Sequence, residues 1–146
     1  MKKISIASDH GGFALKEPVA NALQNAGYEV IDFGPQSADS VDYPDYAKKV
    51  GNSVKHSESD LGILICTTGI GMSIAANKMI GIRAALAHNE DSAHFGRLHN
   101  NANIMCMGIK YVSPELGAKM ALIFASTEFE AGRHARRVDK FDHMNS

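Results

Sequence analysis

The sequence predicts a single α/β domain over residues 1–146, with three layers: a five-stranded, parallel, Rossmann-like sheet, helices on both of its faces, and a further helix at the C-terminus. Short runs rich in β-branched residues alternate with longer amphipathic runs, which is the pattern of consecutive strand–helix–strand units. Leu61–Cys66 is apolar on both faces, as expected of a central parallel strand. A length of 146 residues with 45% hydrophobic residues is typical of one globular domain.

The predicted elements follow one another without a linker, an internal repeat or a low-complexity segment. Apolar and β-branched runs predict strands, and the amphipathic runs between them predict helices. Strands are expected at residues 4–8, 29–33, 61–66, 82–87 and 104–107. Helices are expected at about residues 13–26, 43–56, 73–78, 90–99, 113–125 and 130–143.

Local signals mark several helix ends. Gly27 closes the first helix, where a left-handed residue is favoured. Pro18 lies inside the same helix, so we expect this helix to begin later or to bend there. Residues typical of N-caps precede three later helices: Asp42 or Tyr43, Asn89 and Ser113.

Charge and composition exclude several classes of protein. Fifteen basic and sixteen acidic residues leave a net charge of -1, without the concentrated positive field that nucleic acids or anionic membranes require. No segment approaches the ~20 apolar residues that span a bilayer, and strand-like alternation from residue 4 leaves no room for a signal peptide. Two cysteines are too few for a disulfide framework. We therefore expect a cytoplasmic protein with neither a nucleic acid nor a membrane as its partner.

Candidate functional residues follow the first and third strands. Ligands of open parallel sheets collect beyond the carboxyl ends of the strands. Asp9 and His10 come directly after the first strand and precede two glycines, whereas Cys66 ends the third and is followed by Thr67 and Thr68. The sequence therefore predicts that a titratable pair and a thiol share one edge of the sheet.

The turn Gly69-Ile70-Gly71 opens directly into a helix. Its glycines let backbone N–H groups face a ligand closely, and the helix N-terminus adds partial positive charge. Such a nest suits a phosphate or the oxygen of a developing enolate. The same glycines also suit a plain strand–helix turn, and the turn alone does not decide between the two.

The two cysteines lie in different surroundings. Cys106 stands mid-strand between two methionines, where a cysteine behaves as a small hydrophobic residue. Cys66 borders the glycine turn, and a helix N-terminus favours its thiolate. A thiolate at this position can act as a nucleophile or as a base that abstracts a proton, and the residues alone leave both open.

The seven histidines show no metal-binding spacing. No two of them have the i,i+4 spacing of an H-E-x-x-H helix, and the chain has no C-x-x-C, so no metal site is expected. His99 ends the helix predicted at residues 90–99, which carries it about 15 Å back from the edge that holds Cys66. His99 is then either a plain cation at a helix C-terminus, which the geometry alone favours, or part of a neighbouring subunit's site.

The densest basic cluster lies near the C-terminus. Arg133 and Arg137 are four residues apart, so on a helix both guanidinium groups project from one face. Two converging arginines can grip a phosphate dianion through paired hydrogen bonds. A solvated face or a set of salt bridges at an interface is the commoner role of such a run, and without other observations this role is favoured over phosphate binding.

Together these segments resemble a known family. The chain is similar over almost its whole length to the B-type ribose-5-phosphate isomerases, which belong to a sugar-phosphate isomerase family that also includes galactose- and allose-6-phosphate isomerases. The combination of motifs, in this order and spacing, is highly specific. The matching segments are residues 9–12 with 15–16, 42–44, 62–71, 74–78, 81–84, 99–103 and 132–137.

The resemblance implies a metal-free and cofactor-free isomerisation of an aldose phosphate to a ketose phosphate through an enediolate. It implies that Cys66 moves the proton between C1 and C2 with help from Thr68, that His99 opens the furanose ring, and that Asp9 holds the ring oxygen or hydroxyls. The backbone of Thr67, Thr68, Gly69, Ile70 and Gly71 would stabilise the enediolate oxygen. The remaining substrate contacts implied are Tyr43 and Asn100 for the sugar and His10, Lys110, Arg133 and Arg137 for the phosphate.

The resemblance also implies a homodimer whose active sites are shared between subunits, with a tetramer as the alternative assembly. Some relatives use a glutamate at the position of Met72, and methionine cannot accept a proton, so this chain resembles the cysteine type. It departs from that type at Thr67, where glycine is common, and at Lys110, where arginine is usual. These departures leave the choice between a five-carbon and a six-carbon substrate open.

A nucleotide-binding module of the Rossmann type is the other alternative. Gly69-Ile70-Gly71 begins a G-x-G, and Glu90 lies ~20 residues further on, as a ribose-binding acid would. The place of the third glycine holds Ile74, however, and Glu90 opens a predicted helix where the motif requires the end of a strand. A non-catalytic relative that only binds sugar phosphates is disfavoured because Cys66 and His99 are both present.

Overall fold

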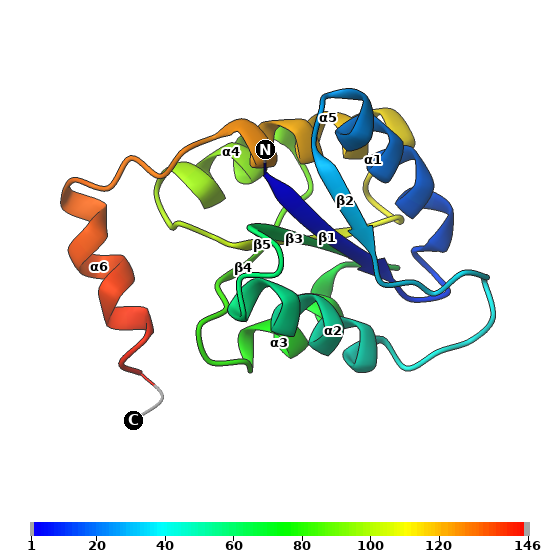
Figure 1. The fold of residues 1–146 in the computed structure, drawn as a ribbon, viewed down its shortest axis with the longest axis horizontal. Helices are drawn as coiled ribbons and strands as arrows, with labels where there is room; N and C mark the ends of the chain where they lie inside the picture. Colours follow the sequence, from blue (N-terminus) through cyan, green and yellow to red (C-terminus); the bar gives the residue numbers. More distant parts are fainter. Residues whose placement is uncertain (1, 145–146) are drawn as a thin grey trace.

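The structure is a computed structural model that describes residues 2–144 (Figure 1). The strands within these residues are β1 (Lys3–Ser8), β2 (Glu29–Asp32), β3 (Leu61–Cys66), β4 (Ala84–Leu86) and β5 (Ile104–Gly108). The helices are α1 (Phe13–Asn25), α2 (Tyr43–Lys55), α3 (Ile70–Asn77), α4 (Glu90–Leu98), α5 (Pro114–Ser126) and α6 (Arg133–Phe141).

The five strands form one parallel sheet in the order β2-β1-β3-β5-β4. The central strands β3 and β5 are buried along their whole length, as the apolar run Leu61–Cys66 predicts. Because all strands are parallel, their carboxyl ends lie at one edge of the sheet. The predicted α/β class with a five-stranded parallel sheet is confirmed.

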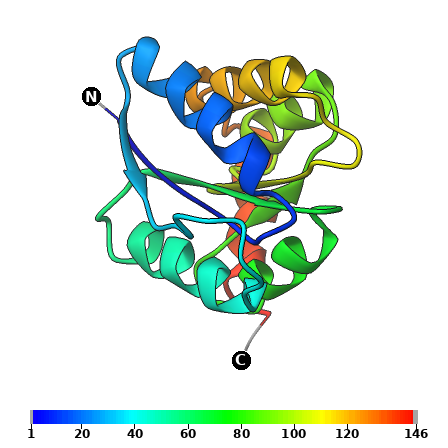
Figure 2. The same cartoon turned by 90° about the vertical axis from the view of Figure 1, so that its right-hand side faces the viewer.

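Helices cover both faces of the sheet (Figures 1 and 2). One face carries α1, α4 and α5, whose core includes Leu15 and Phe124. The other carries α2 and α3, whose core includes Val50 and Met72. Asn89 and Ser113 cap α4 and α5 through their side chains, as predicted. None of the helices among residues 2–144 is long and apolar enough to cross a membrane.

The C-terminal helix α6 stands away from these layers, beyond the amino ends of the strands (Figure 1). Val138 is its only buried residue within the described chain. A groove of about 460 Å³ separates the end of α6 from the sheet and is lined by Arg83, Asn100 and Phe141, among others. The packing of α6 within a single chain is therefore slight.

Two predicted helix starts were wrong. The third helix begins at Ile70, because Gly69 takes a left-handed conformation with φ of 82° and completes the turn alone. The last helix begins at Arg133, because Ala131 and Gly132 both have positive φ. The first helix begins at Phe13, as its predicted bounds require, and it continues through Pro18 without the later start that this proline suggested. Because Pro18 has no backbone N–H, the helix lacks one backbone hydrogen bond at this residue.

The predicted strand at residues 82–87 is shorter in the structure, at Ala84–Leu86. Before it, the amide of Arg83 donates to the side-chain oxygen of Asn103 at 2.8 Å. The side chain of Asn103 therefore takes the place that a neighbouring strand's carbonyl would have as the partner of the Arg83 amide. Gly27, with φ of 96°, follows the end of α1 as predicted.

Candidate active site

Cys66 ends β3 at the carboxyl edge of the sheet and is only 5% exposed. Its Sγ accepts a hydrogen bond from the amide of Gly69 at 3.1 Å. That amide belongs to the residue that caps α3, so the partial positive charge of the helix N-terminus lies against the sulfur. Both contacts can stabilise negative charge on the sulfur during a reaction.

Beside the sulfur, the turn that leads into α3 contributes several backbone donors. The amide of Ile70 donates to Oγ1 of Thr68 at 3.3 Å. Among the hydrogen bonds of the described residues, none uses the N–H of Thr68 or of Gly71. Free N–H groups at a helix N-terminus form a site for negative charge. The nest interpretation of the glycine turn therefore gains support over a plain turn.

The loop after β1 packs against this nest. The amide of Asp9 donates to the carbonyl of Ile65 at 3.0 Å, and its carboxylate accepts from the amide of Gly12 at 2.8 Å. A side chain at Gly11 would overlap the hydroxyl of Thr67, and one at Gly12 would lie 2.6 Å from the carbonyl oxygen of Ile65. Glycine is required there because the two loops approach so closely. Asp9, Thr67 and Cys66 therefore share one edge, as predicted.

Tyr43, His10 and Lys110 also lie at this edge. The ring of Tyr43 leaves no room for a side chain at Gly71, because a Cβ there would be 2.6 Å from it. Nδ1 of His10 accepts a long hydrogen bond of 3.4 Å from the amide of Val41. The amide of Lys110 donates to the carbonyl of Thr67 at 2.9 Å, and its side chain is exposed. The edge thus combines a thiol, an anion nest and two groups able to carry positive charge.

The other predicted site residues lie at the opposite edge. His99 caps the C-terminus of α4, and Asn100 follows it. The chain then enters β5 through Asn103, whose amide and carbonyl bond to Arg83 and Gly62 at the amino ends of β4 and β3. A strand of six residues spans about 20 Å, so His99 and Cys66 of one chain do not meet.

Arg133 and Arg137 lie on α6, also beyond the amino edge of the sheet (Figure 1). Both are exposed, and neither forms an ion pair with any residue between 2 and 144. The structure thus divides the predicted site residues into two groups, one at the carboxyl edge of the sheet and one at its amino edge. Cys66 and the nest form one group, and His99, Asn100 and the two arginines form the other.

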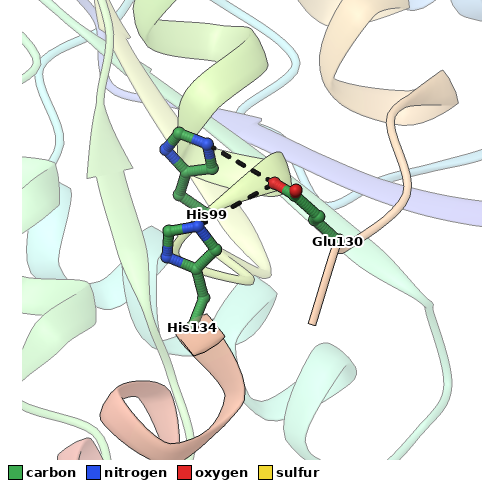
Figure 3. A group of neighbouring side chains, drawn as sticks. All are labelled: His99, Glu130 and His134. Carbon is green, nitrogen blue, oxygen red and sulfur yellow. Dashed lines mark ion pairs between the residues drawn. The ribbon is translucent and has the colours of Figure 1, made fainter. Parts of the chain in front are cut away.

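Two residues that the sequence analysis did not select join His99 (Figure 3). Nε2 of His99 lies 3.6 Å and Nε2 of His134 lies 3.8 Å from the same carboxylate oxygen of Glu130. The two rings stack with centroids 4.3 Å apart. The i,i+4 spacing of Glu130 and His134 within the helix predicted at residues 130–143 was the available signal. In the structure the helix begins only at Arg133, and a backbone hydrogen bond to Leu98 positions Glu130.

The pKa of His134 is lowered from the ordinary histidine value. The largest cause is burial of the ring, followed by the proximity of His99 and then of Arg133. The carboxylate of Glu130 acts in the opposite direction and raises the pKa. His99 and Arg133 disfavour a further positive charge on the ring of His134. The neutral imidazole is therefore the favoured form of His134.

Comparison with known proteins identifies the family. The family described as Ribose/Galactose Isomerase matches residues 4–141. This chain belongs to the ribose/galactose isomerase family. Ribose-5-phosphate isomerase B of Escherichia coli strain K12 is 44% identical over 139 residues, which cover 95% of this chain and 93% of that protein. The chain is accordingly an isomerase.

Solved structures of ribose/galactose isomerases share the fold closely. Ribose-5-phosphate isomerase B of Clostridium thermocellum has a TM-score of 0.95 at 49% identity, covering 98% of this chain and 97% of that one. The enzyme of Thermotoga maritima has a TM-score of 0.95 at 52% identity, covering 98% and 99%. That of Mycoplasma genitalium, solved with bound ribulose 5-phosphate, has a TM-score of 0.93 at 43% identity, covering 98% and 95%.

Proposed function

We propose that this isomerase interconverts D-ribose 5-phosphate and D-ribulose 5-phosphate through an enediolate, with Cys66 as the base. One observation carries the proposal: the sulfur of Cys66 lies at the mouth of an anion nest and accepts the amide of Gly69. Relatives that match over nearly the whole chain are named ribose-5-phosphate isomerase B, which supports the substrate.

The chemistry needs both parts of this edge. A proton next to a carbonyl is only weakly acidic, so its removal requires that the negative charge on the developing enediolate oxygen be stabilised. The N–H groups of Thr68 and Gly71 are the available donors. The thiolate takes the proton from C2 of the aldose and, as a thiol, returns it to C1, while the hydroxyl proton on O2 passes to O1. No redox cofactor enters, because the same group removes and returns the proton. Thr68 assists from the nest, and Asp9 holds the ring oxygen or hydroxyls.

A phosphate grip and a ring-opening group complete the proposal. His10 and Lys110 beside the nest, with Arg133 and Arg137, bind the phosphate, and Tyr43 and Asn100 position the sugar. His99 opens the furanose ring. A phosphate bound far from the reacting carbons fixes the position of the sugar and so lowers the barrier.

Within one chain these residues lie at opposite edges of the sheet. The proposed enzyme therefore works as a homodimer, in which each active site combines the Cys66 edge of one copy with the His99 edge of the other. Ile70 and Ile74 support this assembly. They are 47% and 58% exposed on α3 beside the nest, where a second copy would cover them. Exposed apolar residues that adjoin a binding site are typical of an interface.

A six-carbon sugar phosphate is the alternative substrate, since Lys110 keeps the charge of an arginine without its planar fork. The nucleotide-binding alternative loses support, because Glu90 opens α4 and does not end a strand. The proposed setting of the enzyme is the cytoplasm.

The decisive assay follows conversion of ribose 5-phosphate and of allose 6-phosphate in excess chelator, for the unmodified enzyme and for Cys66→Ala. Conversion of the five-carbon substrate that survives chelation and disappears in the variant is the expected result. Turnover of the six-carbon substrate alone would replace the substrate, and full activity of the variant would refute the assignment of the base.

A further inference from the structure

His99, Glu130 and His134 form a compact cluster at the amino edge of the sheet, which we call the His–Glu–His cluster. One ligand atom from each residue lies within 4.8 Å of the other two. Figure 3 shows both imidazole rings turning a nitrogen toward the same side of the Glu130 carboxylate. Two imidazole nitrogens and a carboxylate oxygen are a donor set that zinc and related divalent ions bind well.

The main chain holds all three residues in place. The amide of Glu130 donates to the carbonyl of Leu98 at 2.9 Å, which fixes the carboxylate next to the end of α4. The amide of His99 donates to Phe95, and that of His134 to Ala131, each at 2.9 Å. The positive φ of Ala131 and Gly132 then reverses the chain and returns His134 to the carboxylate. The cluster therefore belongs to one chain and does not depend on an assembly.

The polar atoms of the cluster are not satisfied by one another. Separations of 3.6 and 3.8 Å are too long for hydrogen bonds. Nε2 of His134 is buried and has no hydrogen-bond partner in the described chain. A buried polar atom without a partner is uncommon and calls for a ligand or another explanation. A cation placed among the three groups would bind each of them directly.

The spacing fits such an ion. Bonds of about 2.0–2.1 Å in a tetrahedral zinc site hold neighbouring ligand atoms roughly 3.4 Å apart. The two distances to Glu130 exceed this by only a few tenths of an ångström. The histidine nitrogens, at no more than 4.8 Å, close the remaining gap by small rotations of their side chains. Three protein ligands leave the fourth position to water.

We propose that the His–Glu–His cluster is a binding site for a divalent transition-metal ion, of which zinc is the best fit, and that its occupation inhibits the isomerase. The inhibition, unlike the binding, rests on the proposed function, because a metal bound to His99 would occupy the imidazole that is proposed to open the ring. The ion is thus a regulator and takes no part in the isomerisation.

Binding is tested first, without reference to activity. Chelator-treated enzyme is titrated with Zn²⁺ by calorimetry and with Co²⁺ by visible absorption, which reports tetrahedral coordination. We expect one ion per chain. Glu130→Gln and His134→Asn should each weaken binding at least tenfold, since each removes one of three ligands. His56→Asn, on an exposed histidine at the end of α2, is the matched control and should bind as the unmodified enzyme does.

A Cys66→Ala background separates this site from the thiol. Unchanged Co²⁺ binding in that background supports the cluster, whereas lost binding or a sulfur-to-cobalt charge-transfer band in the unmodified enzyme would move the ion to Cys66. Stoichiometric binding that survives both Glu130→Gln and His134→Asn would overturn the site. So would the absence of stoichiometric binding.

Activity is measured second. Zn²⁺ should inhibit the unmodified enzyme over the concentration range in which it binds, and Glu130→Gln should shift that inhibition at least tenfold toward higher Zn²⁺. Binding at the cluster without inhibition would keep the site and contradict the ring-opening role of His99. An enzyme that binds Zn²⁺ at the cluster but does not convert ribose 5-phosphate even in chelator would refute the proposed function alone.

Discussion

The amide of Gly69 donates a hydrogen bond to the sulfur of Cys66 at 3.1 Å. The left-handed conformation of Gly69, with φ of 82°, turns this N–H back toward the strand end and starts α3 in the same step. A Cβ at Gly69 would lie 2.7 Å from Leu86 and 2.9 Å from the backbone of Met107. The residue that shapes the nest is therefore restricted to glycine both by its φ and by the space around it.

Cys66→Ala should lower kcat by about 10²–10⁴-fold, the usual contribution of a general base, while the circular dichroism spectrum stays unchanged. Cys106→Ala is the matched control. Complete burial raises the pKa of the Cys106 thiol far above its ordinary value, so this sulfur stays protonated. That variant should keep its kcat and lose about 1–2 kcal/mol of unfolding free energy. An equal loss of kcat in both variants would contradict a specific role for Cys66.

A site shared between two copies predicts complementation. Cys66→Ala and His99→Asn should each be inactive alone, but a mixture unfolded and refolded together contains heterodimers with one intact site. At equal amounts such a mixture should recover roughly a quarter of the unmodified activity, because half of the dimers each carry one of two sites intact. Isomerase rate against mixing ratio is the measurement. No recovery, with heterodimers shown by mass spectrometry, would mean that both residues serve the same chain's site.

Gly108→Ala should displace the backbone of Thr68, which forms part of the anion nest. A Cβ at this position would lie within 2.5 Å of the backbone of Thr68, which cannot move without displacing the donors. We expect a loss of about 1–3 kcal/mol in unfolding free energy and about a hundredfold in kcat.

Gly117→Ala in α5 is the control for Gly108→Ala. Its new Cβ meets only side-chain atoms, the nearest being Leu15 Cδ1 at 3.0 Å. Alanine also favours the helix by up to about 1 kcal/mol, so kcat should be unchanged and stability nearly so. Denaturant titration and steady-state kinetics of the two variants distinguish a disturbed nest from a general intolerance of added volume.

The lowered pKa of His134 predicts a direction for its titration. Burial and nearby positive charge disfavour the imidazolium in the folded state, so the NMR midpoint of His134 should fall below that of a peptide spanning residues 130–137. Protonation then favours the unfolded chain. The contribution of His134 to stability is full above the midpoint of the peptide and declines as the pH falls below it.

Two substitutions check the sign for His134. Arg133→Gln removes a neighbouring positive charge and should raise the midpoint, whereas Glu130→Gln removes the opposing negative charge and should lower it further. Opposite movements would show that the surroundings of His134 differ from those in the structure. The midpoint of His134 in the unmodified protein is the reference for both variants.

The order of strands and helices could be predicted from the sequence, because each depends on local periodicity. The bounds of β3 agree with its apolar run, and the caps at Asn89 and Ser113 follow from single residues. The placement of Cys66 beside Asp9 also follows, since parallel strands bring their carboxyl ends to one edge. Helix starts at Ile70 and Arg133 were misplaced, because left-handed residues end the preceding turn without changing the apolar pattern.

The α/β class, the thiol beside the glycine turn and, through the resemblance, the family all follow from the amino-acid sequence. Which distant groups meet depends on the three-dimensional packing. Glu130 reaches His99 because a backbone hydrogen bond ties it to Leu98 and a left-handed reversal returns His134 to the same carboxylate. No periodic pattern records such a meeting, since it depends on long-range packing and on a few unusual backbone angles.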